Sequence, residues 1–367
     1  MFTSRMMWFA FLIAFTLASI QLSPAQELAS ATADQTQQNK RNIVILPTGG
    51  TIAGAAATGT QSGYQSGAVT IDAMLAAVPD IGKNANIKGE QISNVGSQDM
   101  SFDILLKLAK RINELAPQSD VDGFVITHGT DTMEESAYFL NLTVKTTKPF
   151  VLAGPMRPST AASADGPLNL YNAVAVASDP SASGRGVLVV MNDQIHGAHS
   201  LIKTSTTDVD TFMSPYRGIV GVSNFGRNEF YNVPPWLHTT RSESDICNVT
   251  TLPRVDILMP YADMPPDLIN DSVENGAKGI VIAGVGNGNM NKASVDAAAE
   301  AVKRGVIVVR SSRVPTGIVG RNVELNDDDL GFVASSELNP QKARILLSLA
   351  LLNPRMPQDV QRLFNTY

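Results

Sequence analysis

This chain of 367 residues has a single cysteine, Cys247, and its scarcity of cysteine excludes two kinds of chemistry. No intramolecular disulfide can form, and no paired-cysteine redox or zinc site can exist. Basic residues are also in deficit, with 28 Lys and Arg against 34 Asp and Glu and a formal net charge of -6. Because binding to a phosphate backbone needs clustered Lys and Arg, we expect no nucleic-acid partner. Stability must therefore come from packing.

Nucleotide-binding and hydrolase signatures are missing as well. Residues 48–54 (TGGTIAG) have neither the GxGxxG spacing nor the GK[ST] ending of phosphate-binding loops. Residues 284–289 (GVGNGN) have their third glycine one position too early, and we interpret them as a turn that needs positive φ at its glycines. No GxSxG nucleophile elbow occurs.

Metal ligands are few. Of the four histidines, only His196 and His199 lie close together in the sequence. A zinc site needs further nitrogen, sulfur or oxygen ligands at suitable spacing, and we find none. We therefore expect no metal and no other cofactor, and we predict that the histidine pair lies in an exposed loop. Cys247 lies in a polar segment, which is not typical of a nucleophile.

The chain begins with the pattern of an export signal. A basic residue precedes an uncharged apolar run at residues 6–22, and small residues follow it. The apolar core is shorter than the ~20 residues of a membrane-spanning helix and ends near Pro24, which argues against a permanent anchor. We predict cleavage after Ala25, with Ala31 or Ala33 as alternative positions, and export to the periplasm. After removal of the signal we expect no association with a membrane.

From residue 42 onward, short β-branched runs alternate with segments of helical period. Four near-continuous apolar runs are typical of strands buried on both faces, and they lie at residues 42–46, 123–127, 149–153 and 186–191. Ser101 can cap a helix whose apolar residues share one face, and further helices are expected at residues 133–144 and 168–177. This alternation predicts an α/β fold with a doubly wound, mostly parallel sheet.

The length of the chain suggests two domains. Residues 232–253 are rich in Pro, Ser and Thr and have no sustained period, so we predict a linker there. The predicted order is a signal peptide at 1–25, a polar arm at 26–40, a larger catalytic α/β domain at 41–231, the linker, and a smaller α/β domain at 254–367. In the smaller domain we expect strands at 256–259, 279–283 and 306–310, and helices at 266–275, 292–304 and 339–352.

Polar loops follow four predicted strands, one of them a strand at residues 92–95. These loops lie at residues 48–54, 96–99, 127–132 and 191–193. In parallel sheets, ligands bind beyond the carboxyl ends of the strands, so we expect the four loops to converge at one edge. They carry hydroxyl, amide and carboxylate groups, which suit a small polar ligand.

Two threonines are candidates for chemistry at this edge. Thr51 and Thr130 each follow a strand and a glycine, where the backbone can approach a ligand closely. A threonine hydroxyl is a weak nucleophile and needs a neighbouring base or proton relay. Asp131 and Lys203 could supply that relay, although a solvated surface lysine is the alternative interpretation of Lys203.

Six segments of the chain resemble the exported bacterial type II L-asparaginases. They are ILPTGGTIAG (45–54), GSQDM (96–100), VITHGTDTMEESAYFL (125–140), MRPSTAASADGPLNLYNAV (156–174), KTSTTDVDTF (203–212) and RSSRVPTG (310–317). The resemblance covers residues 41–367, and the pair TGGTIA and HGTDT is specific. It implies hydrolysis of L-asparagine to L-aspartate and ammonia, often with weaker action on L-glutamine.

The resemblance also implies roles for individual residues. Thr51 is implied to attack the side-chain amide carbon and form an acyl-enzyme, with Tyr64 assisting. Thr130, Asp131 and Lys203 are implied to relay protons. The residues implied to contact the substrate are Ser97, Gln98, Thr130 and Asp131, together with Asn289 and Glu324 of a neighbouring subunit in a homotetramer. Which hydroxyl acts first stays open.

Residues 55–68 are small, polar and rich in glycine, and they carry Tyr64. This composition suits a lid that closes over a substrate, with a plain disordered loop as the alternative. One departure from the family stands at His199 and Ser200, where its members usually carry Arg-Asp. GSQDM is closer to the asparagine-preferring members than to the glutaminase-asparaginases.

Two other functions remain open at this point. A glutamine-preferring amidase would use the same residues. A periplasmic solute-binding protein would also have two α/β domains, an export signal and a polar cleft. Binding alone needs no nucleophile, so Thr51, Thr130 and Lys203 argue for an enzyme.

Overall fold

The apolar runs of the N-terminal half form one eight-stranded sheet in the computed structural model, which describes residues 40–50 and 75–367. The strand order is β10-β9-β6-β5-β4-β3-β1-β2, and the strands from β2 to β5 are parallel. The strands are β1 (Arg41–Ile45), β2 (Ala85–Gly89), β3 (Gly123–Thr127), β4 (Phe150–Ala153), β5 (Val187–Met191), β6 (Gln194–Gly197), β9 (Gly221–Asn224) and β10 (Arg227–Phe230). Every residue of β3, β4 and β5 is buried, as expected for strands covered on both faces.

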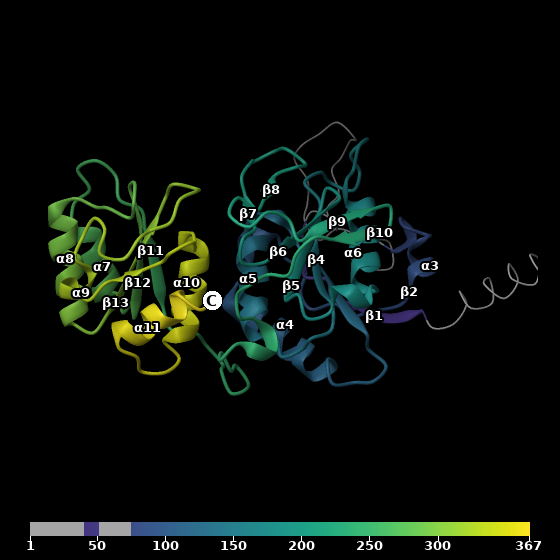
Figure 1. Ribbon diagram of the computed structural model, residues 1–367, viewed down its shortest axis with the longest axis horizontal. Coiled ribbons are helices and arrows are strands. Elements are labelled where there is room, and N and C mark those ends of the chain that lie inside the picture. The colour runs from purple at the N-terminus through teal and green to yellow at the C-terminus, as the bar shows by residue number, and fades with distance from the viewer. Residues whose placement is uncertain (1–39, 51–74) are drawn as a thin grey trace, which may run out of the picture. The chain divides into compact units, whose positions relative to one another are not determined.

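Helices cover both faces of this sheet (Figure 1). They are α3 (Ile81–Asn84), α4 (Phe102–Leu115), α5 (Met133–Thr143) and α6 (Gly166–Ala177). Phe124 and Ile126 of β3 pack with α4 and α5, whereas Val125 between them packs with α6 on the opposite face. Helix α4 begins as predicted, because the Ser101 hydroxyl accepts a hydrogen bond from the Ile104 N–H. The predicted doubly wound α/β fold is confirmed.

The predicted strand at residues 92–95 is wrong. Ile92 donates its N–H to the Pro47 carbonyl at 3.0 Å and Val95 forms an isolated bridge to Gly49, but no regular ladder connects them. The strand in this region is β2, which pairs with β1 along its whole length. Its side chains are largely exposed because β2 is the edge of the sheet, so it lacks the apolar run by which buried strands are predicted.

A second, four-stranded parallel sheet follows in the order β11-β12-β13-β14. Its strands are β11 (Val255–Leu258), β12 (Gly279–Gly284), β13 (Ile307–Ser312) and β14 (Val333–Ala334). Its helices are α7 (Asp267–Glu274), α8 (Lys292–Lys303), α9 (Asp327–Leu330), α10 (Pro340–Ala350) and α11 (Pro357–Phe364). Ile280 and Val308 pack with α7 and α8, whereas Val281 and Val309 pack with α10. This smaller sheet is therefore also covered on both faces (Figure 1).

Helix α10 packs against elements of both sheets. It packs on β11 and β12 and also on α5, so one apolar cluster runs from the first sheet into the second. The Tyr138 hydroxyl donates to the Tyr367 carbonyl across this junction at 2.7 Å. Residues 41–367 form one compact unit, and the predicted domain boundaries at 231 and 254 stay a prediction.

Short elements complete the described chain. They are the two-stranded pair β7 (Ile202–Lys203) and β8 (Phe212–Met213), and the 3-10 helices η2 (Ser97–Asp99), η3 (Thr130–Thr132), η4 (Pro180–Ala182) and η5 (Thr239–Arg241). The turn predicted at residues 284–289 is confirmed, with φ values of 51° at Gly286 and 75° at Gly288. Among the described residues, no helix has both the length and the apolar character needed to span a membrane.

Candidate active site

Three of the four predicted loops meet where backbone passes close to backbone. Gly50 has a φ of 84°, and an added Cβ would lie 2.3 Å from the Gly129 nitrogen. Gly49 has a φ of 109°, and an added Cβ would lie 2.4 Å from the Val95 oxygen. Only glycine tolerates both the positive φ and the close approach. The ends of β1 and β3 and the segment before η2 therefore converge at one sheet edge.

The fourth predicted loop lies at the same edge, because β5 is parallel to β4, but its polar groups bond to a helix. Asn192 and Asp193 have φ values of 48° and 62° and form the tight turn between β5 and the antiparallel strand β6. The Asn192 N–H donates to Asn169 at 3.0 Å, and Asp193 accepts a hydrogen bond from Asn172 at 2.9 Å. Helix α6 therefore takes up the polar groups of this loop. The turn at this loop is tight because the next strand, β6, runs antiparallel to β5.

Ser97 connects η2 to η3. Its buried hydroxyl accepts a hydrogen bond from the Asp131 N–H at 3.2 Å, and its carbonyl accepts one from the Thr132 hydroxyl at 2.7 Å. Gln98 is exposed, and its side-chain amide donates to Asp99 at 3.2 Å. Ser97 therefore positions the backbone that carries Thr130 and Asp131.

Lys203 reaches this edge from far along the sequence. Its Nζ donates to the Thr130 hydroxyl oxygen at 3.1 Å and to an Asp131 carboxylate oxygen at 2.6 Å. Thr130 is buried, the Lys203 side chain is 17% exposed and the Asp131 side chain 58%. A hydroxyl bonded to an amine that also contacts a carboxylate can pass a proton along this line. Lys203 is thus not a solvated surface lysine, while the catalytic roles of the three residues stay predictions.

A glutamate of α5, which is also bonded to the start of α10, holds the backbone of Lys203 in place. The buried Glu134 carboxylate accepts hydrogen bonds from the Lys203 N–H and from the Asn339 side-chain amide, each at 3.1 Å. Asn339 is also the N-cap of α10, because its side-chain oxygen accepts from the Lys342 N–H at 3.1 Å. The start of α10 and the approach to Lys203 are therefore connected through one carboxylate.

Lys342 adds a second connection from α10. This fully buried side chain donates to the His199 carbonyl at 2.9 Å and to the Leu201 carbonyl. Burial lowers the pKa of Lys342 to about 8, an effect partly opposed by the nearby Glu134. Sequence reasoning missed Glu134, Asn339 and Lys342. A signal existed for Lys342, which lies among the apolar residues of a helix face.

His128 stabilises the loop that leads from β3 to Thr130. Its Nδ1 lies 2.6 Å from the Gly129 carbonyl oxygen, and its Nε2 lies 2.8 Å from the Ser136 hydroxyl. The ring is completely buried, and burial lowers its pKa to about 4. His128 is therefore neutral at pH 7 and orders the backbone just before Thr130.

The prediction of an exposed histidine pair is wrong. His196 lies in the buried strand β6, where its Nδ1 is 3.0 Å from the Ser214 hydroxyl. His199 is buried and stacks on Trp236 with ring centroids 4.7 Å apart. Burial lowers the pKa of both rings. Both side chains are structural because neighbouring elements that the sequence alone did not indicate cover them.

Four predicted site residues lie away from this cluster or outside the description. Thr51 and Tyr64, with the predicted lid at residues 55–68, are outside the described residues. Asn289 is half-buried in the loop after β12, and Glu324 is exposed in the loop before α9. Neither is bonded to Thr130, Asp131 or Lys203.

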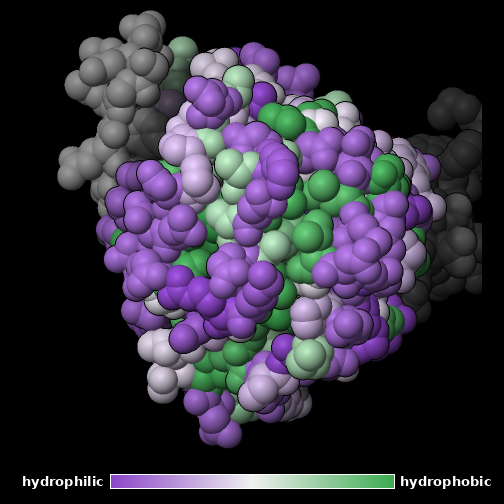
Figure 2. Space-filling view, turned by 90° about the vertical axis from the view of Figure 1, so that its left-hand side faces the viewer, coloured by the Kyte–Doolittle hydropathy of each residue, from purple (hydrophilic) through white to green (hydrophobic). Residues whose placement is uncertain are grey.

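The end of the molecule where α7, α8 and α9 lie has a largely hydrophilic surface, with apolar residues between the polar ones (Figure 2).

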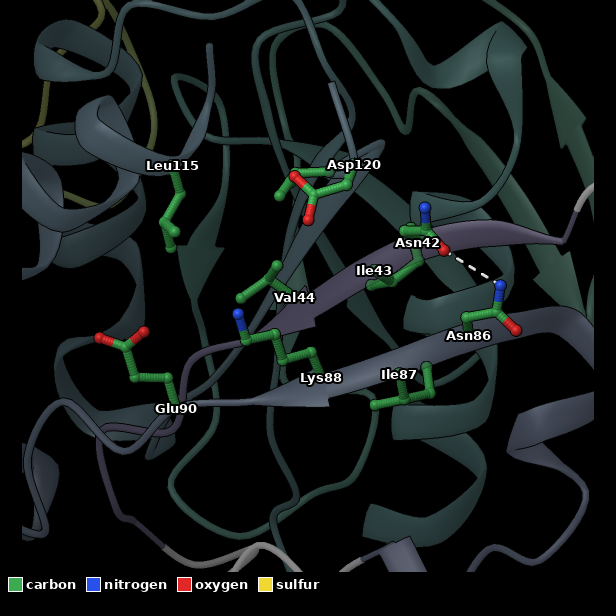
Figure 3. Close-up of a pocket in the computed structure, with 10 residues that line it drawn as sticks. Asn42, Ile43, Val44, Asn86, Ile87, Lys88, Glu90, Leu115 and Asp120 are labelled. Atoms are coloured by element: carbon green, nitrogen blue, oxygen red, sulfur yellow. Dashed lines mark hydrogen bonds between the residues drawn. The ribbon is translucent and has the colours of Figure 1, made fainter. Parts of the chain in front are cut away.

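Two cavities lie beside the sheets. The first, of roughly 330 Å³, lies beside β1 and β2, where Asn86 donates to Asn42 at 3.0 Å (Figure 3). At its rim Glu90 is paired with Arg111, and this hydrogen bonding lowers the pKa of Glu90. None of the predicted site residues lines it. A second cavity, of roughly 440 Å³, borders Lys203 at the carboxyl ends of β11, β12 and β13.

A metal site is not formed by this part of the chain. Within residues 40–50 and 75–367, no group of three or more His, Cys, Asp or Glu side chains is placed to hold a metal ion. Cys247 is exposed in the segment between the two sheets. The chemistry that the described site offers is that of a hydroxyl, an amine and a carboxylate.

Comparison with known proteins gives matches over both sheets. Residues 42–235 match the family model described as "Asparaginase, N-terminal", and residues 254–364 match "Glutaminase/Asparaginase C-terminal domain". A protein of Haemophilus influenzae named "Probable L-asparaginase periplasmic" is 52% identical over 89% of this chain and 93% of its own length. "L-asparaginase 2" of Escherichia coli is 51% identical over 89% of this chain and 93% of its own.

A solved structure agrees with these matches. The crystal structure of a probable cytoplasmic L-asparaginase from Campylobacter jejuni superposes with a TM-score of 0.87 at 48% identity. It covers 89% of this chain and 100% of the other. The similarity therefore extends over most of the chain.

Proposed function

We propose that this chain, which belongs to the asparaginase family, hydrolyses the side-chain amide of L-asparagine to give L-aspartate and ammonia. The observation that carries the proposal is the position of Lys203, whose Nζ lies 3.1 Å from the Thr130 hydroxyl and 2.6 Å from Asp131. A protein that only binds its ligand has no need of this relay.

The proposed reaction combines the roles that the family resemblance implies for Thr51 and Tyr64 with the groups around Thr130. The Thr51 hydroxyl, assisted by Tyr64, adds to the amide carbon and gives up its proton, and the C–N bond breaks as the nitrogen takes up a proton and leaves as ammonia. Water then hydrolyses the resulting ester and restores Thr51. Ammonia is a poor leaving group, so proton transfer through Thr130 and Lys203 would lower both barriers. Backbone N–H groups at the glycine-flanked strand end would stabilise the oxyanion.

Substrate recognition is assigned to polar groups beside this relay. Ser97 and Asp131, with Gln98 and Thr130, would hold the α-carboxylate and α-amine. Asn289 and Glu324 would complete the site from a neighbouring subunit of a homotetramer. Their positions on the second sheet, without a bond to the Thr130 cluster in their own chain, are consistent with such sharing.

Preference for asparagine over glutamine is the second part of the proposal. Two relatives near 50% identity are named L-asparaginases, while one matching family description also includes glutaminases. A comparison of kcat/KM for the two amides with the purified mature chain tests both. We expect ammonia release with asparagine preferred. A kcat/KM for glutamine equal to or above that for asparagine would favour a glutamine-preferring amidase instead.

Binding without turnover is the outcome that would remove the enzyme proposal. Thr51→Ala should abolish ammonia release, while its thermal unfolding stays that of the unchanged protein. Near-native turnover in this variant would remove Thr51 as the nucleophile. Tight amino-acid binding with no turnover in the unchanged chain would instead indicate a solute-binding protein.

Export and domain organisation are also proposed. Cleavage after Ala25 would release a periplasmic protein with a polar arm at residues 26–40, a domain at 41–231, a linker, and a domain at 254–367. One relative's name includes the word periplasmic, and the two family matches end and begin at residues 235 and 254. The mass of the protein recovered from the periplasm tests the cleavage, and full-length mass in the cytoplasm would contradict it.

A further inference from the structure

The second sheet contains an ion pair that is closed to solvent. Arg310 lies in β13 and Asp327 begins α9, and both side chains are 0% exposed. The contact is bidentate, with Nε to Oδ1 at 2.6 Å and Nη2 to Oδ2 at 2.7 Å. The sequence did not indicate that these two side chains are buried, because charged residues are rarely fully buried.

The remaining N–H groups of Arg310 bind two loops. Nη1 donates to the Asn287 carbonyl at 3.0 Å and to the Gly288 carbonyl at 3.4 Å. Nη2 donates to the Gly320 carbonyl at 3.0 Å. A guanidinium group has five N–H donors in a rigid plane, and this arrangement uses its two edges for different partners.

Asp327 strengthens the second of these loops. Its Oδ2 also accepts a hydrogen bond from the Asn322 N–H at 2.8 Å. The two loops are joined directly as well, because the Gly320 N–H donates to the Asn287 side-chain oxygen at 2.9 Å. Arg310 and Asp327 therefore lie at the junction of the loop after β12 and the loop before α9.

These two loops carry Asn289 and Glu324. Asn289 follows Gly288 directly, and its backbone exchanges hydrogen bonds with Val285 at 2.8 and 2.9 Å, which closes the turn. Glu324 follows Asn322 by two residues. The junction is thus within two residues of both side chains that the proposed function places in a neighbouring active site.

Stability alone does not account for a buried pair of this kind. Removing two charges from water offsets much of their attraction, and well-packed apolar residues are often as stabilising. An apolar pair cannot direct hydrogen bonds to three carbonyl oxygens on two loops. The planar donor geometry of Arg310 is the property that an apolar residue, or a lysine, would lose.

We propose that the Arg310–Asp327 pair is the positioning element that sets Asn289 and Glu324 relative to each other, and that its catalytic effect falls on the active site of the neighbouring subunit. This inference rests on the proposed function, in which sites are shared between subunits. Arg310 and Asp327 do not touch the substrate themselves.

The first measurement compares two conservative substitutions. Arg310→Lys keeps the charge and loses the planar donors, and we expect kcat/KM for asparagine to fall roughly 10- to 100-fold, mainly through KM, because a misplacement of about 1 Å has effects of this order. Arg254→Lys is the matched control. Arg254 also makes a bidentate pair, with Asp256 at 3.0 and 2.9 Å, but it is bonded to neither loop. The control should keep native kinetics.

The second measurement is rescue in trans. Arg310→Lys chains are co-expressed with differently tagged Thr51→Ala chains, and mixed oligomers are purified. With random assembly, about a quarter of the sites combine an intact Thr51 with intact loops from the other chain. We expect those sites to show native KM. A loss of general stability would not be repaired in this way.

Three outcomes would overturn the inference. Native KM in the Arg310→Lys oligomer would do so. Impaired Arg310→Lys chains that Thr51→Ala does not rescue, while it does rescue Glu324→Ala chains, would refute the positioning role and leave the proposed function intact. Failure to rescue Glu324→Ala would remove the shared site and this inference with it. If Arg310→Lys chains do not assemble, the paired variant Arg310→Met/Asp327→Leu, which has no lone buried charge, replaces it with the same expected rescue.

Discussion

The two sheets each contain an ion pair with a shortest contact of 2.6 Å, and the two pairs differ in exposure. Lys203 and Asp131 are 17% and 58% exposed at the edge of the first sheet, whereas Arg310 and Asp327 are both at 0% in the second. An exposed pair contributes little to stability, but a ligand can reach it. A ligand cannot reach a pair that is fully buried, and all the hydrogen-bond partners of such a pair must be protein groups. The same contact is therefore accessible to a ligand in one region and closed to solvent in the other.

Removing Lys203 should separate activity from stability most strongly. We expect Lys203→Met to lower kcat roughly 10²- to 10⁴-fold, because the relay to Thr130 is lost. The free energy of unfolding should change by about 1 kcal/mol or less, because the partner Asp131 stays hydrated. Lys148→Met is the control, since Lys148 bonds the Gln118 and Val121 carbonyls away from the site. Steady-state kinetics and urea unfolding measure both effects, and a large stability loss with native kcat would reverse the comparison.

Removing Arg310 should give the opposite result. Arg310→Met leaves Asp327 buried without its partner, so we expect the free energy of unfolding to fall by about 3–5 kcal/mol. The paired variant Arg310→Met/Asp327→Leu should recover most of this loss. Denaturant unfolding at one protein concentration measures both. A loss below about 1 kcal/mol in the single variant would show that Asp327 is less isolated than its burial indicates.

A decrease in pH should lower the stability of the first sheet before that of the second. All four histidines lie before residue 254, and burial lowers the pKa of His128 and His196 to about 4 from an ordinary 6.5. Between pH 6.5 and 4 the unfolded chain binds more protons than the folded one, so stability falls as pH decreases, by up to about 1.4 kcal/mol per pH unit for each histidine. Hydrogen-exchange protection factors, which correct for the intrinsic exchange rate at each pH, should therefore fall in β3 and β6 before β12 and β13 between pH 7 and 4.5.

A histidine variant sharpens this test. His196→Gln should reduce the dependence of stability on pH, because one of the four buried histidine rings with a lowered pKa is gone. An equal fall of the protection factors in both sheets would contradict the assignment of acid sensitivity to the first region.

The smallest expected effect concerns the link between the regions. Glu134→Gln leaves one of two donors, the Lys203 N–H or the Asn339 amide, without an acceptor, and we expect a stability loss of about 1–3 kcal/mol with a reduced kcat. Glu135→Gln is the adjacent control, because none of the hydrogen bonds to Lys203 involves Glu135. Equal kcat values in the two variants would show that Glu134 does not position Lys203.

Local patterns predicted much of the fold. The Ser101 cap, the apolar runs of β3 to β5 and the glycine turn after β12 each follow from residues a few positions apart. Strand β2 was missed because an edge strand lacks an apolar run. The antiparallel direction of β6 was not predicted, because the direction of a strand depends on its neighbours.

The residues of the site also divide into those that local patterns predicted and those that they missed. The pair of motifs around Thr51 and Thr130 pointed to the family, and the loop order suggested the approach of Lys203. Glu134 and Lys342 remained hidden, since a glutamate or lysine on a helix is ordinarily a solvated residue. Their partners come from segments far away in the sequence, which only the packing of α5 against α10 brings together.

By itself the sequence determined the alternation of strands and helices, the absence of disulfides, and the motifs of the asparaginase family, because each depends on residue type and short spacing. Only the tertiary structure decided which charges are exposed and which are closed. Lys203 and Arg310 are both basic residues in or beside strands, and no local pattern distinguishes them. Burial is a property of all the segments that surround a side chain, so the chemical accessibility of one and the structural role of the other exist only once both sheets have packed.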